Sequence, residues 1–421
     1  MNMDVKFNSP RLSGEVRAIS SKSEAHRLLI CAALSDKPTK IICTDTNNDI
    51  DATASCLNSL GAKIERVSDG FTVKPIISPV SPASLDCGES GSTLRFLIPI
   101  IAALGVGAEI TMHGRLPQRP LSPLYELLEK EGIKMSAQGE NPFTVKGKIR
   151  AGNYSIAANV SSQFISGLLF ALSLTEGEST LTLEGKIESK NYIDMTLDAI
   201  SLFGGNVTFS DNTFTVRSIG GFKSSELVAV GGDWSNAAFF LCAGALSEDP
   251  VTVTGLDMNS SQGDKAILDV LGEMGANISI GENAVTVSKN GLRGIELDAS
   301  QIPDLVPIIA TVASVADGKT VIYNATRLKM KESDRILSTC NMISALGGNT
   351  TPTDDGMIIC GVGRLSGGEV SSAQDHRIAM SAAIASTVSD SPVTVRGFEA
   401  INKSYPNFKL DFDKLTLNGE N

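Results

Sequence analysis

Acidic and basic side chains gather in the stretch RLKMKESDR, Arg327–Arg335. Lys331 and Arg335 would share one face if the stretch is helical, and like charges at this spacing destabilise an isolated helix by about 0.2–0.5 kcal/mol. Taken alone, the stretch is typical of a solvated helix face. An anion bound by the two cations would also explain it, and Glu332 would then lie close to that anion.

Cations also stand near the starts of other predicted helices, namely Lys22, Arg27, Arg95 and Arg377. A cation in a first helical turn opposes the helix macrodipole by roughly 0.3–1 kcal/mol. A bound anion reverses the sign, because helix N-termini and guanidinium groups both favour phosphate and carboxylate. The sequence therefore predicts that these helix starts bind anions.

Further polar residues occupy equivalent places in the chain. At the starts of apolar helices stand Ser23, Gly91, Ser161, Ser162, Gln163, Asp233 and Asp304, and on or before amphipathic helices stand Arg119, Ser189, Lys331, Glu332, Arg335 and Lys403. Ser and Asp at a helix start also act as N-caps, worth about 1 kcal/mol each. For Asp233 and Ser161 this structural role and a role in binding are equally good interpretations.

A repeat of about 71 residues organises these positions. Gly61, Gly132, Gly204, Gly275 and Gly347 follow one another at spacings of 71, 72, 71 and 72 residues. Each ends an amphipathic helical run, where a left-handed C-cap favours glycine, and a strand-like pattern such as FTVKP or FTVRS follows. We expect a sixth amphipathic helix within 403–415.

A second series of segments lies between these glycines. The runs 20–34, 89–104, 161–174, 232–246, 302–316 and 374–387 are apolar on nearly all sides, as buried helices are. The chain is thus predicted to be α/β, with six β/α units of about 70 residues that pack against one another. Three units per domain is the natural division, with a crossing at Gly231-Gly232.

Composition excludes several classes of protein. With 421 residues, 42% hydrophobic and 20% charged, the chain is typical of a globular protein. Its 36 basic and 47 acidic residues give a net charge of −11, which argues against a general nucleic-acid or anionic-membrane surface. The seven cysteines are scattered, no signal peptide or apolar run of membrane-spanning length is apparent, and we expect a cytoplasmic protein.

Common site signatures are also missing from the sequence. It contains no phosphate-binding P-loop, no dinucleotide-binding glycine motif and no zinc-protease or nucleophile-elbow motif. The three histidines, 26, 113 and 376, share no metal-ligand spacing. We therefore expect no metal in the site.

Eleven motifs carry a resemblance to a known family. The chain contains, in order, SKSEAHR, LDCGESGSTLRF, QRPLSPL, SSQFISGLLFAL, SKNYIDMT, GDWSNAAFFL, SSQGD, IPDLVPIIAT, MKESDR, DHRIAM and KSYPNF. In this order they resemble the 5-enolpyruvylshikimate-3-phosphate (EPSP) synthases, or 3-phosphoshikimate 1-carboxyvinyltransferases, within the enolpyruvyl transferases. The match covers essentially the whole chain.

The resemblance implies an inside-out α/β fold of two domains with the active site in the cleft between them. The N-terminal strand would join the second domain, so that the domains would be 21–231 and 1–20 with 232–421. It also implies the transfer of the enolpyruvyl group of phosphoenolpyruvate to shikimate 3-phosphate, without a metal or organic cofactor, by a protein that we expect to be a monomer.

The resemblance also implies roles for individual residues. Shikimate 3-phosphate would be held by Lys22, Ser23, Arg27, Ser161, Ser162, Gln163, Ser189, Asp304 and Lys331. Phosphoenolpyruvate would be held by Lys22, Gly91, Arg119, Gln163, Arg335, Arg377 and Lys403. Asp304 would take the proton of the attacking hydroxyl, Glu332 would protonate the methylene carbon, and Lys22 would assist catalysis.

The chain departs from the family pattern at Glu89, Ser92, His26 and Asn191, of which Glu89 is the most consequential, and two alternatives remain. Glu89 stands where the family usually has Asn, and a carboxylate there should weaken phosphoenolpyruvate binding unless it is paired or turned away. A UDP-N-acetylglucosamine enolpyruvyl transferase would share the fold, but it usually carries a nucleophilic Cys near 110–120, and this chain has none there. A non-catalytic repeat protein that binds a phosphorylated metabolite is the alternative of another class.

Overall fold

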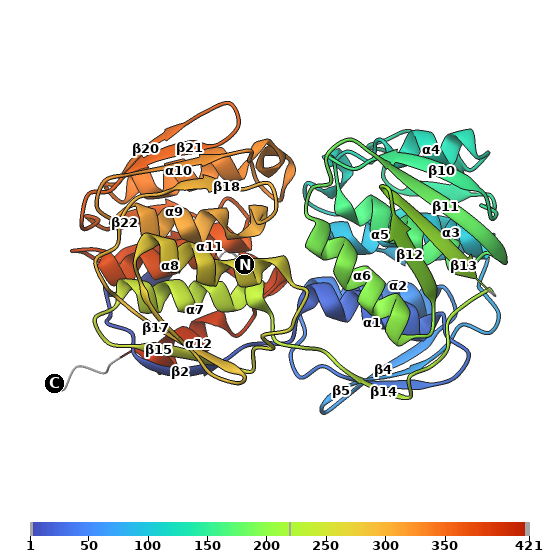
Figure 1. Ribbon diagram of the computed structural model, residues 1–421, viewed down its shortest axis with the longest axis horizontal. Helices are drawn as coiled ribbons and strands as arrows, with labels where there is room; N and C mark the ends of the chain where they lie inside the picture. The colour runs from blue at the N-terminus through green and yellow to red at the C-terminus, as the bar shows by residue number, and fades with distance from the viewer. Residues whose placement is uncertain (1–2, 219, 417–421) are drawn as a thin grey trace. The chain divides into compact units, whose positions relative to one another are not determined.

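The computed structural model describes residues 3–218 and 220–416. The chain folds into two compact units. Unit 2 is the continuous segment Ser20–Val230, and unit 1 combines the residues up to Ile19 with those from Gly231 onward. Figure 1 shows the ribbon of both units, which are described separately below.

Three helices fill the interior of unit 2: α1 (Lys22–Ala33), α3 (Gly91–Leu104) and α5 (Ser162–Leu172). Nearly all of their residues are buried, because these runs lack a polar face. The outer helices are α2 (Asn48–Ser59), α4 (Leu124–Lys130) and α6 (Lys190–Leu202), with the short 3-10 helix η1 (Leu116–Gln118).

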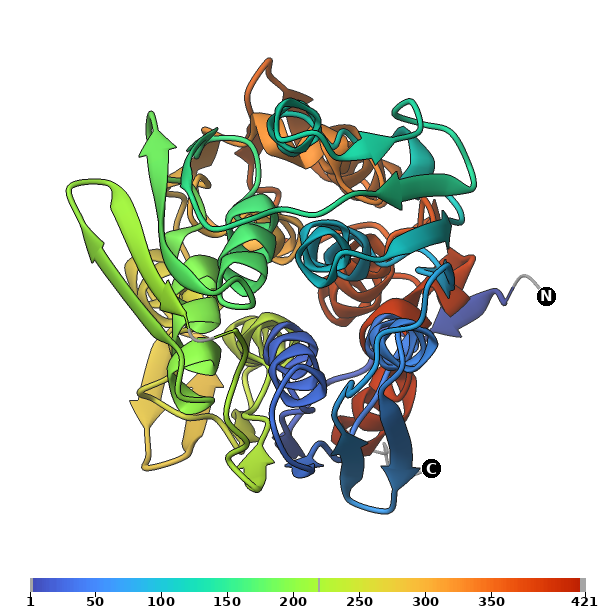
Figure 2. The ribbon, with the colours of Figure 1, turned by 90° about the vertical axis from the view of Figure 1, so that its right-hand side faces the viewer.

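The strands of unit 2 form sheets around these helices, as the blue-to-green ribbon in Figure 2 shows. In spatial order the first sheet is β14 (Leu227–Ala229), β3 (Thr39–Ile42), β5 (Gly70–Lys74) and β4 (Lys63–Val67). The second is β6 (Ala83–Asp86), β7 (Gly107–Thr111), β9 (Phe143–Lys146) and β8 (Lys134–Met135). The third is β10 (Asn153–Ala157), β11 (Gly177–Glu184), β13 (Thr213–Ser218) and β12 (Asn206–Ser210).

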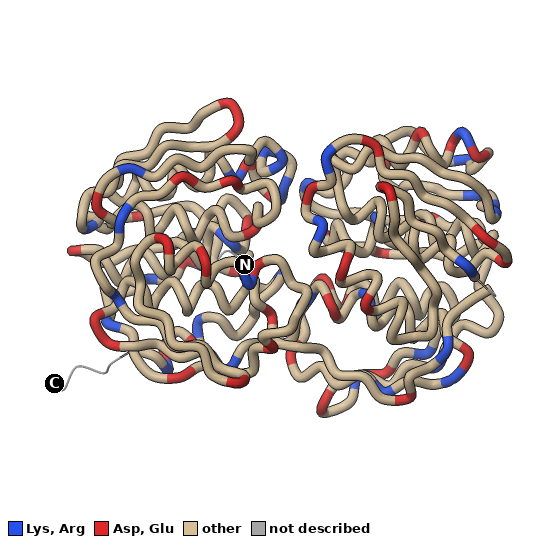
Figure 3. Tube along the Cα trace, in the orientation of Figure 1, with Lys and Arg blue, Asp and Glu red and all other residues tan. Residues whose placement is uncertain are grey.

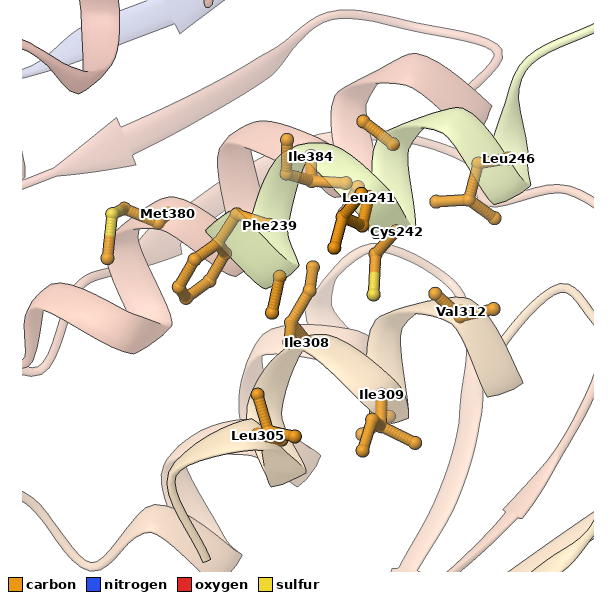
Figure 4. Packing of buried hydrophobic residues seen from close by; sticks show 14 of the residues in the cluster. Phe239, Leu241, Cys242, Leu246, Leu305, Ile308, Ile309, Val312, Met380 and Ile384 are labelled. Atoms are coloured by element: carbon orange, nitrogen blue, oxygen red, sulfur yellow. The ribbon is translucent and has the colours of Figure 1, made fainter. Parts of the chain in front are cut away.

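Unit 1 repeats this plan around α7 (Trp234–Leu246), α9 (Val306–Ala313) and α11 (His376–Ala385). Every residue of α7 is buried. Figure 4 shows Phe239 and Leu241 of α7 beside Ile308 of α9 and Met380 and Ile384 of α11. Each fully buried aliphatic side chain of this kind contributes about 1.5–3 kcal/mol, so the contact among the inner helices fixes where their N-termini lie within the unit.

The outer helices of unit 1 are α8 (Ile267–Met274), α10 (Arg335–Ala345) and α12 (Phe408–Leu415). Short 3-10 helices connect the elements: η2 (Gly263–Ala266), η3 (Pro303–Leu305), η4 (Thr326–Met330), η5 (Ser386–Val388) and η6 (Phe398–Lys403). Several of them lead directly into inner or outer helices, and they carry candidate site residues. The sixth amphipathic helix predicted within 403–415 is confirmed as α12.

The strands of unit 1 form sheets of the same kind. The first contains β16 (Asn277–Ile280), β17 (Ala284–Ser288), β15 (Val251–Thr254) and β2 (Gly14–Arg17). The second contains β18 (Glu296–Asp298), β19 (Lys319–Tyr323), β21 (Met357–Cys360) and β20 (Asn349–Pro352). The third contains β1 (Val5–Phe7), β23 (Val393–Arg396) and β22 (Gly368–Ser371), so that both N-terminal strands belong to unit 1.

Over the described ranges the strands thus form six sheets, which confirms the six predicted β/α units. In each sheet one edge strand runs parallel to its neighbour, which pairs antiparallel with the next strand. The five glycines of the repeat all have positive φ, between 71° and 112°. Glycine is favoured there because a side chain rarely adopts this conformation. The predicted left-handed glycines at the helix ends are confirmed: Gly275 is itself a C-cap residue, and each of the other four directly follows the C-cap residue of its helix.

Charged residues of both signs are interspersed along the trace of each unit (Figure 3). None of the helices in the described parts of the chain is long and apolar enough to cross a membrane.

Candidate active site

Arg335, the first residue of α10, holds three carboxylates in unit 1. Its Nε lies 2.7 Å from Oδ2 of Asp375, its Nη1 lies 2.6 Å from Oδ1 of Asp304, and its Nη2 lies 2.7 Å from Oε2 of Glu332. Its side chain is 1% exposed. Burial alone would lower the pKa of Arg335, but these carboxylates raise it above its usual value. The guanidinium therefore stays charged and fixes the proposed acid and base relative to each other.

Asp304 lies in η3, at the start of the helical segment that continues as α9, and three cations surround it. Besides Arg335, Lys331 Nζ is 3.2 Å from Oδ1 and Arg377 Nη2 is 3.7 Å from Oδ2. Burial alone would raise the pKa of this carboxyl, but the three cations outweigh burial and hold it well below its usual value. Asp304 is thus ionised at neutral pH.

The stretch Arg327–Arg335 is not one helix. Its first part forms η4, Lys331 follows in extended conformation, and α10 begins at Arg335 with Asp334 as its N-cap. The idea that Lys331 and Arg335 share a helix face is therefore wrong, because the capping aspartate starts a new helix between them. The two cations are brought together by Asp304, which contacts both.

Arg377 and Lys403 belong to the same end of unit 1. Arg377, in the first turn of α11, donates from Nη2 to Ser235 Oγ at 2.7 Å. Lys403, the last residue of η6, donates to the backbone oxygen of Gln374 at 3.0 Å, just before α11. Both cations lie near the N-terminus of this inner helix, a place that favours anions.

In unit 2, Arg27 lies between α1 and α6. It donates from Nη1 to the backbone oxygen of Ser23 at 2.5 Å, from Nη2 to that of Tyr192 at 2.7 Å and from Nε to the hydroxyl of Thr196 at 2.8 Å. Burial lowers its pKa to about 10. Lys22, at the start of α1, pairs with Asp49 at 2.9 Å.

A second group in unit 2 joins the N-termini of α3 and α5. Gln163 accepts from Arg95 Nη1 at 2.7 Å and donates to Ser92 Oγ at 2.8 Å. A Cβ on Gly91 would lie 2.7 Å from Arg119 Nη1, so glycine lets the guanidinium approach the start of α3. Helix N-terminus and guanidinium both attract anions, and their close approach here favours a bound anion.

Three serines also belong to the candidate site residues of unit 2. Ser161 is the N-cap of α5 and accepts from the backbone of Gln163 at 3.3 Å, while Ser162 is the first residue of that helix and is buried. Ser189 precedes α6 with φ of 52°. Non-glycine residues in this region cost of order 1–3 kcal/mol and cluster at functional sites, which supports a binding role for Ser189.

The structure corrects the predicted positions of two arginines and agrees with one interpretation of Asp233. Arg27 and Arg95 lie in the second turn of their helices, because Ser21 and Ser90 are the N-caps; the predicted first-turn position is wrong for both. Asp233 is the N-cap of α7 and accepts from the backbone of Asn236 at 2.8 Å, as its structural interpretation predicted.

Sequence reasoning missed three residues that contact the site cations, namely Asp49, Thr196 and Ser235, and it also missed the contact of Asp375 with Arg335. Asp375 lies two residues before Arg377 in DHRIAM, and an aspartate so close to a predicted site arginine was a usable signal in the sequence. In the structure its side chain is 0% exposed. The others face the cations only through tertiary packing. No group of His, Cys, Asp and Glu suited to holding a metal occurs among the described residues.

Unit 1 therefore offers two carboxylates joined by cations, suited to proton transfer beside bound anions. Unit 2 offers arginines and serines suited to holding phosphate or carboxylate. Both sets are at the N-terminal ends of inner helices or beside them. A reaction on anionic substrates that moves protons without a nucleophilic cysteine fits these residues.

Comparisons with known proteins agree with this chemistry. A family model described as EPSP synthase (3-phosphoshikimate 1-carboxyvinyltransferase) matches residues 8–412. A 3-phosphoshikimate 1-carboxyvinyltransferase of Clostridium kluyveri is 40% identical over 414 residues, which cover 98% of this chain and 97% of that protein. One of Clostridioides difficile is 39% identical over 425 residues, with coverage of 98% and 97%.

Solved structures confirm the predicted two-domain inside-out α/β fold class. EPSP synthase from Acinetobacter baumannii matches with a TM-score of 0.81 and 26% identity, over 99% of each chain. The enolpyruvyl transferase NikO from Streptomyces tendae matches with a TM-score of 0.78 and 19% identity, over 98% of this chain and 97% of that one, which bears on the fold alone. The chain belongs to the EPSP synthase (3-phosphoshikimate 1-carboxyvinyltransferase) family.

Proposed function

We propose that the two groups of residues divide the work of the family's reaction in this chain. The reaction transfers the enolpyruvyl group of phosphoenolpyruvate to the 5-hydroxyl of shikimate 3-phosphate, in the shikimate pathway to aromatic amino acids. The observation that carries our assignment is that Asp304 and Glu332 are both held by Arg335. One cation thus links the proposed base, the proposed acid and an anionic substrate.

In this proposal, nine residues bind shikimate 3-phosphate. The set is Lys22, Ser23, Arg27, Ser161, Ser162, Gln163, Ser189, Asp304 and Lys331. Arg27 supports it because its three hydrogen bonds go to neutral oxygens, and a phosphate would supply the negative charge that these oxygens lack. Charge-assisted hydrogen bonds of this kind are worth about 1.5–3 kcal/mol each.

Phosphoenolpyruvate is bound by Lys22, Gly91, Arg119, Gln163, Arg335, Arg377 and Lys403. The packing of Arg119 on Gly91 supports this set in unit 2, and the position of Arg377 at the start of α11 supports it in unit 1. Arg335 exchanges its bond to Glu332 for the substrate carboxylate. That exchange releases the carboxyl group of Glu332 for proton donation.

Asp304 takes the proton of the 5-hydroxyl as the oxygen attacks C2 of phosphoenolpyruvate. A carboxylate with a strongly lowered pKa is a weak base, and the three cations around Asp304 hold its pKa low. Substrate anions bound to Lys331, Arg335 and Arg377 neutralise these charges and raise the pKa of Asp304. The base therefore becomes effective when both substrates are in place.

Glu332 protonates C3 of phosphoenolpyruvate as the new carbon–oxygen bond forms. The resulting tetrahedral intermediate then loses phosphate from C2 and a proton from C3, which restores the double bond. Lys22 assists catalysis by holding both substrates. The cations stabilise the charge that develops on the phosphate leaving group.

Glu89 is turned toward the loop at Gly114. A Cβ on Gly114 would lie 2.5 Å from Glu89 Oε2, so the carboxylate packs on that glycine. We infer that this orientation reduces the repulsion that Glu89 exerts on phosphoenolpyruvate. The effect on affinity is therefore modest.

We further infer that the protein works in the cytoplasm as a monomer, on small-molecule substrates, with no metal, organic cofactor, nucleic acid or membrane as a partner. The surplus of acidic residues supports the absence of a nucleic-acid or anionic-membrane partner. Added chelator should leave turnover unchanged, and a large loss of turnover would contradict the metal-free reaction.

Phosphate release from purified protein with shikimate 3-phosphate and phosphoenolpyruvate tests the assignment. Release should require both substrates and should fall by orders of magnitude in Glu332→Gln, which keeps the shape of the side chain. Glu273→Gln, a change of an exposed glutamate in α8, is the matched control and should match wild type. Near-normal release in Glu332→Gln would remove the proposed acid.

A further inference from the structure

Four buried polar side chains of unit 2 form a continuous chain of hydrogen bonds for which the proposed reaction has no use. They are His26 in α1, Thr53 in α2, Thr93 in α3 and Ser90, the N-cap of α3, and together they are called the His26 chain below. His26 is 1% exposed and the other three are 0% exposed. Burying polar groups is costly unless they are hydrogen-bonded, so each member depends on its neighbours in the chain.

The His26 chain crosses three helices through short contacts. His26 Nδ1 is 2.7 Å from Thr53 Oγ1, and Thr53 Oγ1 is 2.6 Å from Thr93 Oγ1. Thr93 Oγ1 donates to Ser90 Oγ at 2.7 Å. Ser90 Oγ also accepts from the backbone N–H of Thr93 at 3.3 Å, which is the capping bond of α3. The chain therefore leads from the second turn of α1 to the first turn of α3.

The direction of each hydrogen bond follows from the number of hydrogens, because a hydroxyl group has only one to donate. Thr93 donates its hydrogen to Ser90, so it accepts from Thr53. Thr53 has then used its own hydrogen, so it accepts from Nδ1 of His26. The network thus assigns the hydrogen of the imidazole to Nδ1.

The surroundings of His26 agree with this neutral tautomer. Burial, together with the charges of Lys22 and Arg27, lowers the pKa of His26 well below its usual value, so the ring carries one hydrogen at neutral pH. Nε2 is buried and has no hydrogen-bond partner among the described residues. With the hydrogen on Nδ1, no N–H of the ring is buried without an acceptor, which is the rarer and costlier defect.

Helix α2 is held against α1 by a second contact beside the His26 chain. Asp49 stands four residues before Thr53, so the two side chains lie on the same face of α2. Asp49 pairs with Lys22, the first residue of α1, at 2.9 Å. Thr53 is thus fixed relative to α1 from two points, as the positioning of a third element requires.

The far end of the chain controls the start of α3. The Ser90 hydroxyl occupies the backbone N–H of Thr93, whereas the N–H groups of Gly91 and Ser92 have no partner in the parts of the chain that the structure describes. These are the donors that an anion meets at a helix N-terminus. Because they directly follow Ser90, the orientation of the cap decides where they point.

We propose that His26 is a positioning residue for phosphoenolpyruvate, which acts through the two threonines and the Ser90 cap on the start of α3. The chain aims the N–H groups of Gly91 and Ser92 at the anionic substrate. This inference deepens the proposed function and rests on the place given there to phosphoenolpyruvate at Gly91. His26 itself takes no part in proton transfer.

Thr53→Val tests the proposal, because valine keeps the shape of threonine and removes both hydrogen bonds of the hydroxyl. We expect KM for phosphoenolpyruvate to rise roughly 10-fold, the equivalent of one buried hydrogen bond, with kcat changed far less. KM for shikimate 3-phosphate should also change far less, since Arg27 is held by three hydrogen bonds of its own. An unchanged KM for phosphoenolpyruvate in Thr53→Val would overturn the proposal.

Thr53→Ser and Ser55→Ala are the matched controls. Thr53→Ser keeps the hydroxyl and should restore KM for phosphoenolpyruvate to near the wild-type value. Ser55 is an exposed residue of α2, and its substitution should have no effect. If Thr53→Ser is as impaired as Thr53→Val, with both KM values, kcat and Tm affected alike, the role is merely structural and the proposal fails.

Two substitutions of His26 provide an independent comparison that does not need Thr53→Val to fold. The amide nitrogen of asparagine is as many bonds from the backbone as Nδ1, whereas that of glutamine extends as far as Nε2. His26→Asn should therefore keep KM for phosphoenolpyruvate near wild type, and His26→Gln should raise it as Thr53→Val does. The opposite order would contradict the assigned direction of the chain.

Coupling between the members can be measured with the double variant Thr53→Val/His26→Gln. Since either change breaks the same chain, the double variant should raise KM for phosphoenolpyruvate no more than the worse single variant. Additive effects would show that His26 does not act through Thr53, and the proposal would be rejected.

Nitrogen-15 NMR of the imidazoles observes the tautomer directly. The sequence has three histidines, and the signals of His26 are the ones that disappear in His26→Asn. At about pH 7 we expect the shifts of a neutral ring with its hydrogen on Nδ1. A neutral ring with its hydrogen on Nε2 would break the chain at Thr53 and rule the proposal out.

Gly91→Ala distinguishes failure of this inference from failure of the proposed function. A Cβ at Gly91 would lie 2.7 Å from Arg119 Nη1, so the change displaces the guanidinium and should raise KM for phosphoenolpyruvate. If it does so while Thr53→Val and His26→Gln are silent, the inference about His26 is wrong and the proposed function stands. If Gly91→Ala leaves KM unchanged, phosphoenolpyruvate does not bind at α3, and the role of His26 is overturned with it.

Discussion

Arg335 in unit 1 and Arg27 in unit 2 are both buried arginines of the candidate site, yet their surroundings differ. Arg335 touches three carboxylates, whereas the three hydrogen bonds of Arg27 go to two backbone oxygens and a hydroxyl. The pKa of Arg335 is raised, because its carboxylates outweigh burial, and burial lowers that of Arg27 to about 10.

This difference separates two tasks. The carboxylates around Arg335 include the proposed base and acid, so unit 1 is arranged for proton transfer with its charges compensated in advance. Arg27 carries a charge that its neutral partners compensate poorly, so it gains most from a bound phosphate. We propose that the first arginine organises catalytic groups and that the second attracts substrate.

Removing the base from unit 1 should give the largest effect. We expect Asp304→Asn to lower kcat by about 10²–10⁴-fold, the usual contribution of a general acid or base, because an amide cannot take the hydroxyl proton. Phosphate release at saturating substrates measures it. Asp317→Asn, a change of an exposed aspartate in unit 1, should behave as wild type, and a kcat of Asp304→Asn near wild type would reject Asp304 as the base.

The two arginines should also differ in their effect on folding. Arg335→Met leaves buried Asp375 without its cation, and breaking such a pair costs about 3–5 kcal/mol of unfolding free energy. Arg27→Met leaves neutral oxygens unsatisfied and relieves a buried charge, so we expect a loss of roughly 1–3 kcal/mol. Urea unfolding monitored by circular dichroism gives both values. Equal losses would erase the distinction drawn between the two sites.

Arg27 should matter most for binding of shikimate 3-phosphate. We expect Arg27→Gln to weaken its affinity about 10–100-fold, corresponding to one or two charge-assisted hydrogen bonds. Lys331→Met should likewise weaken shikimate 3-phosphate more than phosphoenolpyruvate. Calorimetric titration measures the first affinity directly. Unchanged affinity in Arg27→Gln would contradict the role given to unit 2.

Glu89 should give the smallest effect. Its carboxylate packs on Gly114, so we expect Glu89→Asn to lower KM for phosphoenolpyruvate by about 2–5-fold through reduced repulsion across partly screened solvent. Initial rates at low salt measure it. A 100-fold change in either direction would mean that Glu89 faces the substrate.

Much of the fold could be predicted because the repeat appears in the sequence as local patterns of glycines and apolar runs. The spacing of Gly61 and its four counterparts gave the unit length, and the apolar runs gave the inner helices. The helix start within Lys331–Arg335 was not predicted, because the prediction considered only the charges of Lys331 and Arg335. Asp334 is nevertheless a typical N-cap residue, so the new helix start was visible in the sequence.

The partners of the site residues could not be predicted in the same way. Asp304 and Arg335 belong to one unit of the repeat and Asp375 to the next, and only tertiary packing brings them together. The family resemblance supplied the proposed reacting residues, but not the residues that hold them in place.

The division of labour between the two units is tested most directly by phosphate release from Asp304→Asn and Arg27→Gln, measured side by side while both substrates are raised to saturation. Arg27→Gln should recover a rate near wild type, because it lacks only affinity, and Asp304→Asn should remain at least about 100-fold slower. Recovery of Asp304→Asn, or a persistent defect of that size in Arg27→Gln, would contradict the account.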